Sequence, residues 1–390
     1  FRNKLKKLDD GKELPNLEKD MKGFKKETDK AEGSVKDLGS ELGNLAGGVA
    51  AGLGAGFGIS QSLSAAELDT QIDISFNVSD ESKKEVKRAI KDIETYGIDT
   101  QDALEGVRRQ WALNADATDE SNKKVVDGAA TIARAYNGID FTELIQETNE
   151  IAEALNISDQ EALGLADSLL KAGFPPEQID IISEYGTQLE DAGYEAEEIQ
   201  GIFKAGVDTG TWNIDNLLDG LKEGRIRLSE FGDEVPEAVE DLIEGTDISA
   251  DKLQQWGKDI SKGGEDGKKA MQDVAEALKG VDDETKKNLL GVEFFGTMYE
   301  DQGENIIETL LNAEEQTGNL RENQDKLNES VERLNQDPLV QFKDAMNSLK
   351  EAAMPLLEVI SDVISKVAEW IENNPQLTMT IIAVATAVGT

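Results

Sequence analysis

Apolar residues separated alternately by three and four positions are the feature that most restricts how this chain can fold. Near the start this spacing holds for about five heptads, with Lys, Glu, Asp and Gly between the apolar positions. Such a pattern is typical of a helix that packs against other helices in a coiled coil. The seam consists of Leu14, Leu17, Met21, Phe24, Ala31, Val35, Leu38, Leu42, Leu45 and Val49, with Thr28 at its one polar position.

Two properties of this first seam stay open at the level of sequence. A single amphipathic helix packed on its own core would show the same spacing. The seam also mixes branched and unbranched residues, so it does not choose between a dimer and a trimer. Pro15 stands in the first turn, where proline is tolerated, and therefore favours a helix start at this point.

Heptad spacing returns near the other end of the chain. It begins with Leu320, Gln324, Leu327, Val331 and Leu334, and Pro338 then interrupts it. A second seam follows through Phe342 and Met346 into Leu349, Leu356, Ile360, Val363 and Val367. Pro355 predicts a kink within that helix.

Between the heptad segments the chain shows repeated start and stop signals of short helices. Ser79 predicts a helix start and Gly97 its end, and Ser158 with Glu161 forms a capping box. Stops at Asn156, Gly173 and Gly193 lie 17 and 20 residues apart, which suits stacked helical hairpins. The periods are too irregular to predict a solenoid. Residues 263–264 and 268–276 indicate a looser joint, and 71–78 is the one strand-like run.

These patterns predict an all-α protein in which extended coiled-coil helices flank a central domain of short capped helices. The expected parts are a basic coiled coil over residues 1–46 and a Gly/Ala-rich apolar segment over 47–66. Next comes a central helical domain over residues 67–280. It is followed by a second heptad segment over 281–374 and by the start of another apolar segment over 375–390. Because the chain starts at Phe1 and stops within an apolar run, we expect it to be a piece of a longer protein.

Charge and composition restrict the function. The chain carries 80 Asp and Glu against 40 Lys and Arg, although residues 1–36 are slightly basic. An acidic protein surface repels nucleic acid, so we expect no specific nucleic-acid binding. The acidic side chains could equally serve only to keep the helices soluble. Cysteine and histidine are absent, which excludes cysteine nucleophiles and histidine-based triads. We expect no enzyme activity, no cofactor and no metal site; Asp116, Asp119 and Glu120 are better explained as a helix start than as cation ligands.

Three stretches resemble the tail tape-measure proteins of long-tailed bacteriophages and related prophages. The first is AGFPPEQIDIISEYGTQLEDAGYEAEEIQGIFKAG at 172–206, and the second is GTWNIDNLLDGLKEGRIRLSEFG at 210–232. The third, at 351–390, is similar to the junction before the apolar tracts of these proteins. The order of elements, from a basic heptad segment through a Gly/Ala stretch to a cap-rich helical domain, resembles the N-terminal part of the same family.

The resemblance implies a structural role in the virion. Several copies, at least three, would associate in the lumen of the tail and set the length of the tail tube. They would contact tail-tube proteins, distal-tail or baseplate proteins and tail-assembly chaperones, first in the host cytoplasm. At infection the protein would leave ahead of the DNA and make transient membrane contact that helps the DNA cross the host envelope.

Two other classes of function stay open. The apolar stretches 47–59 and 377–388 would suit a helical membrane-active or pore-forming protein, although the first contains six glycines. The two heptad segments would also suit a cellular coiled-coil scaffold.

Overall fold

The computed structural model describes residues 67–211 and 213–348. The chain divides into two compact units, Phe1–Ile74 with Asp344–Thr390, and Ser75–Lys343. Every regular element among the described residues is a helix, which confirms the all-α prediction. The strand-like interpretation of 71–78 is wrong, because residues 67–75 are helical. Leu68 and Ile72 are buried four positions apart whereas Ile74 is 82% exposed, so the period is that of a helix.

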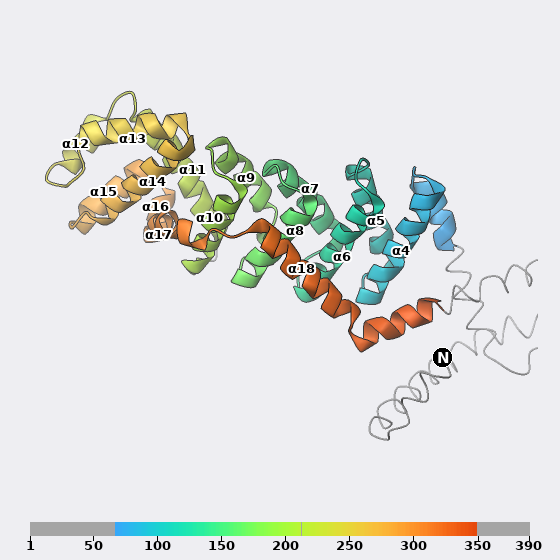
Figure 1. The fold of residues 1–390 in the computed structure, drawn as a ribbon. Coiled ribbons are helices and arrows are strands. Elements are labelled where there is room, and N and C mark those ends of the chain that lie inside the picture. The colour runs from blue at the N-terminus through green and yellow to red at the C-terminus, as the bar shows by residue number, and fades with distance from the viewer. Residues whose placement is uncertain (1–66, 212, 349–390) are drawn as a thin grey trace, which may run out of the picture. The chain divides into compact units, whose positions relative to one another are not determined.

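The second unit begins with four consecutive helix pairs (Figure 1). In chain order they are α4 (Asp80–Tyr96), α5 (Thr100–Leu113), α6 (Asp119–Ala135), α7 (Phe141–Ala154), α8 (Asp159–Ala172), α9 (Ile181–Asp191), α10 (Ala196–Asp208) and α11 (Ile214–Glu230), with the short 3-10 helix η1 (Pro176–Gln178) before α9. The first helices of the pairs, α4, α6, α8 and α10, pack side by side in one layer. The second helices, α5, α7, α9 and α11, form the other layer.

Local sequence signals fix where these helices begin and end. The hydroxyl of Ser79 caps α4, which ends at Gly97 with φ 107°. Ser158 and Glu161 form the predicted capping box of α8, and Gly173 ends that helix with φ 103°. These predicted boundaries are confirmed. Each needs only residues within one helical turn, which is why the sequence indicates them directly.

A repeat underlies the four pairs. The first helices begin at Asp80, Asp119, Asp159 and Ala196, which are 39, 40 and 37 residues apart. The irregular periods seen in the sequence arise because successive stops belong alternately to first and second helices of different length. Comparing every second helix start would have revealed the repeat. The hairpin stacking that the stops predict is therefore present, in a more regular form than the sequence suggested.

A helical bundle around α11 follows the four pairs. It comprises α12 (Glu237–Ile243), α13 (Ala250–Lys262), α14 (Gly264–Lys279), α15 (Glu284–Phe295), α16 (Met298–Gln302) and α17 (Glu304–Asn312). Helices α13, α15, α16 and α17 all contact α11. The rings of Phe231 and Phe294 meet edge to face at 6.0 Å between centroids, and both side chains are buried in the core of this bundle.

The predicted looser joint at residues 263–264 and 268–276 is wrong. Gly263 and Gly264 form a tight turn with φ 67° and 66°, and the Gly264 N–H donates to the Ala192 carbonyl at 3.0 Å. Residues 268–276 lie within α14, where Met271 and Val274 are buried. The glycines signal close backbone approach and left-handed φ rather than flexibility.

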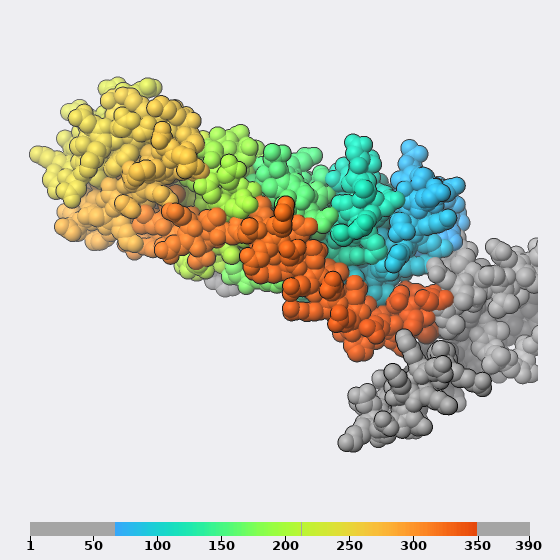
Figure 2. Space-filling view, in the orientation of Figure 1, coloured from blue at the N-terminus to red at the C-terminus, as the bar shows by residue number. Residues whose placement is uncertain are grey.

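The chain then returns along the first layer. After the 3-10 helix η2 (Glu314–Gln316), α18 (Leu320–Asn335) packs on α8 and α6 and forms an orange band along the stacked pairs (Figures 1 and 2). At its far end the Tyr96 hydroxyl of α4 donates to Asn335 Oδ1 at 2.6 Å. Pro338 interrupts the heptad as predicted and starts a helix over 338–348. Two leucines of the α18 heptad are buried within this same chain, Leu320 at 3% and Leu327 at 4% exposure, and Leu334 is partly exposed.

Candidate interaction surface

The residues predicted to form the two seams lie outside the described part of the chain. This holds for all ten apolar positions from Leu14 to Val49 and for the second seam from Leu349 to Val367. Only the approach to the second seam is described, in the helix over 338–348. There Leu339 is 53% and Phe342 60% exposed. The seams therefore stay predictions.

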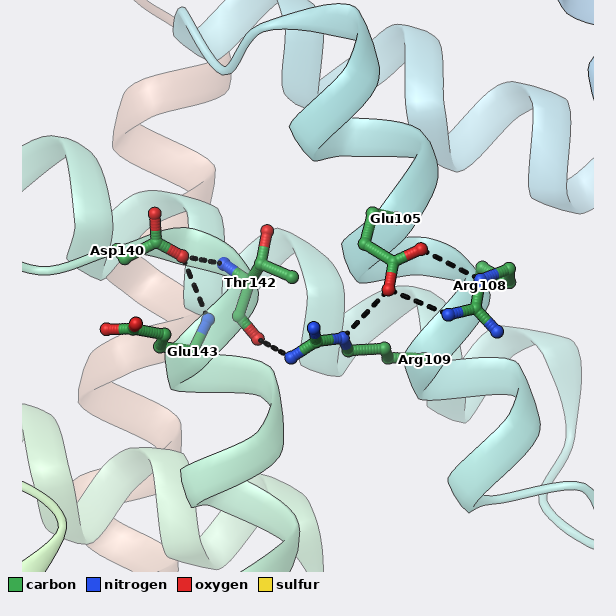
Figure 3. A network of polar contacts seen from close by, with 6 residues as sticks. All are labelled: Glu105, Arg108, Arg109, Asp140, Thr142 and Glu143. Carbon is green, nitrogen blue, oxygen red and sulfur yellow. Dashed lines mark hydrogen bonds and ion pairs between the residues drawn. The ribbon is translucent and has the colours of Figure 1, made fainter.

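Helices α5 and α7 of the second layer are joined by a polar network that uses the two arginines of α5 (Figure 3). Glu105 accepts from Arg108 at 2.7 and 2.8 Å and from Arg109 at 3.0 Å. Arg109 also donates to the Thr142 carbonyl of α7 at 3.4 Å, beside the Asp140 cap. Hydrogen bonds from Arg108 lower the pKa of Glu105 to about 2. These charges connect neighbouring helices and serve the fold.

The segment that follows α6 in the sequence is almost purely acidic among its charged residues. Between Arg134 and Lys204 the sequence contains sixteen Asp and Glu and a single basic residue, Lys171. Helices α7 and α9 pack against each other here and border an open groove of about 530 Å³. Its rim carries Glu150, Glu153, Glu184 and Glu190. Such a surface repels anions, including nucleic acid and acidic membranes.

Glu147, on α7 near this groove, is the carboxyl with the most perturbed environment on the acidic surface. It is half-buried, and burial raises its pKa to about 7, with further contributions from the charges of Asp180, Glu143 and Glu150. The sequence contained no signal for this shift, because it depends on how deeply the side chain packs.

We expect Glu147→Gln to change the pH dependence of stability. Because the pKa of Glu147 is higher in the folded than in the unfolded state, the protonated Glu147 carboxyl adds to the free energy of unfolding. This contribution is complete below about pH 4.5 and is lost as pH rises through about 7. The variant should therefore match the wild type near pH 4 and exceed it at pH 8. Solvent screening reduces the effect to about 1 kcal/mol. Urea unfolding at the two pH values measures the difference, and an equal gap at both would contradict the assignment.

No group of three carboxylates among the described residues is arranged to hold a metal ion. Of the acidic residues considered from the sequence, Asp119 accepts the indole N–H of Trp111 at 2.8 Å, and Glu120 pairs with Lys124 at 2.9 Å. Both carboxylates therefore have structural partners. Within the same described residues, no helix combines the length and the apolar content needed to cross a membrane.

Comparison with known protein families identifies the chain. A family model described as phage-related minor tail protein matches residues 61–296, which is more than half of the sequence. The chain belongs to the phage-related minor tail protein family. No curated protein and no solved structure gives a significant match. This minor tail protein is thus a structural component of the phage tail that contacts other tail components, and its all-helical fold agrees with a non-enzymatic role.

The matched range places the family domain within the fold. It covers the four helix pairs and the bundle as far as α15, and α18 lies outside it. The acidic groove and Glu147 of the minor tail protein fall inside the matched range, whereas both predicted seams fall outside it.

Proposed function

We propose that this minor tail protein is a tail tape-measure protein. In this proposal several copies associate in the tail lumen through the heptad segments and set the length of the tail tube. The observation that carries the proposal is the combination of a phage minor tail domain with heptad segments on both sides of it. A tail component with long seams can form the extended rod that a ruler needs.

Charge supports the same role. A ruler in the tail lumen lies in the path of the DNA and must not bind it. A formal net charge of −40, concentrated after the basic first 36 residues, meets this requirement through repulsion. The proposal includes contacts to tail-tube, distal-tail or baseplate and chaperone proteins. It also includes departure ahead of the DNA at infection, with transient membrane contact by the apolar segments.

The two kinds of segment would contribute to length differently. An extended helix adds about 1.5 Å for each residue. The unit Ser75–Lys343 is instead a stack of paired helices, in which most residues fold back on one another and add little length. The heptad segments would therefore set the tail length. The stacked helix pairs would form a compact domain attached to them and would add little length.

The proposal predicts that whole-heptad deletions shorten tails in proportion. Removing 28 residues, for example 20–47, from the full-length protein should shorten the tail by about 42 Å, because whole heptads keep the seam in phase. A tube grows in whole rings, so a series that removes one to six heptads should give a staircase with this average slope. The length of assembled tails in electron micrographs, plotted against the number of heptads removed, measures this slope.

A deletion of one helix pair is the matched control. Removing residues 119–158, which form α6 and α7, breaks a packed core and should block assembly rather than trim the tail. Intact tails of constant length throughout the heptad series would exclude the proposed ruler. Tails that shorten equally after the loss of a helix pair would mean that the stack is itself extended in the tail.

A further inference from the structure

A small, partly enclosed cavity lies where the stacked pairs meet the helical bundle, between α9, α11 and α14 (Figure 1). Its buried walls include Ile202, Leu218 and Met271. The half-buried residues around it include Gln188, Tyr194 and Arg225, so the cavity opens to solvent on their side. The α9–α11 cavity, as we call it, measures about 30 Å³. One buried water needs roughly 10–15 Å³, so this space suits the end of a single aliphatic side chain.

Two polar groups beside the α9–α11 cavity have no partner among the residues that the structure describes. Gln188 Oε1 is buried and accepts no hydrogen bond there. Within the same described residues, the Arg225 guanidinium makes neither an ion pair nor a hydrogen bond, whereas Arg227 on the same helix pairs with Glu223 at 2.7 Å. Buried polar groups are normally satisfied, so an unpaired acceptor and an unpaired cation at one apolar cavity indicate a missing ligand.

The positive charge of Arg225 determines the charge of that ligand. Burial raises the pKa of Tyr194 to about 12, and the charges of Lys268 and Arg225 oppose this rise, so the field of Arg225 reaches the cavity lining. The chain as a whole carries a formal net charge of −40 and repels anions over most of its surface. An unpaired guanidinium is therefore a local exception. It can bind a carboxylate through two parallel hydrogen bonds.

The volume of the cavity determines the kind of ligand. Pockets that enclose a free small molecule measure about 300–1,000 Å³, far more than this cavity offers. A C-terminal aliphatic residue of a protein carries an N–H, an apolar side chain and a carboxylate on one Cα atom. These three groups match the Gln188 acceptor, the apolar cavity and Arg225. An internal residue would need a second side chain to supply the carboxylate, and ordering that side chain costs free energy.

We propose that the α9–α11 cavity binds the C-terminal aliphatic residue of another tail protein. The aliphatic side chain fills the cavity, its backbone N–H donates to Gln188 Oε1, and its carboxylate accepts from Arg225. The site lies in the unit Ser75–Lys343 and does not depend on the tape-measure role. It gives this minor tail protein a defined contact to a partner, separate from the predicted seams.

Methyl NMR of the full chain tests the site, because Met271 lines the cavity wall and is one of six methionines. The methionine methyl groups are labelled with ¹³C, and Met271→Leu assigns the Met271 signal. N-acetyl-L-leucine carries all three recognised groups, N-acetyl-L-leucinamide lacks the charge and N-acetylglycine lacks the side chain. We expect N-acetyl-L-leucine to shift the Met271 signal with saturation in the millimolar range, and the other two probes to bind at least about tenfold more weakly. The signal of Met298, in α16 and outside the cavity lining, should not move.

Two arginine variants test the carboxylate contact. Arg225→Gln should weaken N-acetyl-L-leucine binding about tenfold, to the level of the leucinamide, and leave leucinamide binding unchanged. Arg227→Gln is the matched control and should bind all three probes like the wild type, because Arg227 does not line the cavity. Equal affinities for the three probes, or no Met271 shift with any of them, would overturn the proposal. A preference for the carboxylate that survives in Arg225→Gln would overturn it as well, since another group would hold the charge.

Discussion

Replacing Gly164 of α8 with alanine should release α18 from the surface of α8. The new methyl group would stand 2.6 Å from the backbone nitrogen and 2.8 Å from the Cα of Gln324. Backbone atoms of a helix cannot move individually, so the whole of α18 must shift. We expect its amides to lose about a hundredfold or more of their protection against hydrogen exchange, which corresponds to about 2.7 kcal/mol. Proteolysis within residues 313–343 should accelerate in parallel.

Gly128→Ala is the matched control. Gly128 also lies inside a first-layer helix beneath α18, but a Cβ there would meet only side-chain atoms, those of Leu163 and Leu327, each at 3.3 Å. A leucine methyl can move by a few tenths of an ångström. Both substitutions raise helix propensity equally, by about 1 kcal/mol, so the difference between them isolates the clash. Equal protection of α18 in the two variants would show that the helix is not held against Gly164.

Phe203→Ala should produce the largest loss of stability among single core substitutions in the helix pairs. The Phe203 ring is fully buried in α10 and meets the ring of Phe174 edge to face, with 5.8 Å between centroids. Removing a buried phenyl ring loses its transfer free energy and leaves a cavity, for an expected cost of about 3–5 kcal/mol. In a unit of this size that should lower the melting temperature by about 10 °C.

Leu289→Ala provides the comparison for Phe203→Ala. Leu289 is 50% exposed on α15, so its truncation should change stability by less than about 0.5 kcal/mol. Thermal unfolding followed by circular dichroism compares both variants with the wild type. A Phe203→Ala melting temperature within a degree or two of the Leu289→Ala value would contradict the packing of α10 against α8.

Helix boundaries were the part of the fold that the sequence predicted best. Ser79, Gly97, Ser158 and Gly173 act through hydrogen bonds and φ angles within one turn, so their effect can be recognised without any tertiary partner. The all-α class follows from the same signals. Family membership, found by comparison, supports the phage tail that the sequence resemblance implied, whereas the tape-measure role and the seams stay proposals.

The sequence determined which segments are helical, and only the tertiary structure decided which partner each helix buries its apolar face against. The stripe from Leu320 to Leu334 has the spacing of a coiled-coil seam, yet Leu320 and Leu327 are buried where α18 packs on α8 and α6 of the same chain. A 3–4 spacing of apolar residues specifies which face of a helix is buried, and it does not specify the surface against which that face packs. That partner depends on contacts such as Gln324 with Gln160, 164 residues apart. The raised pKa of Glu147 has the same origin, because burial is a property of the packed helices and not of the residues beside it in sequence.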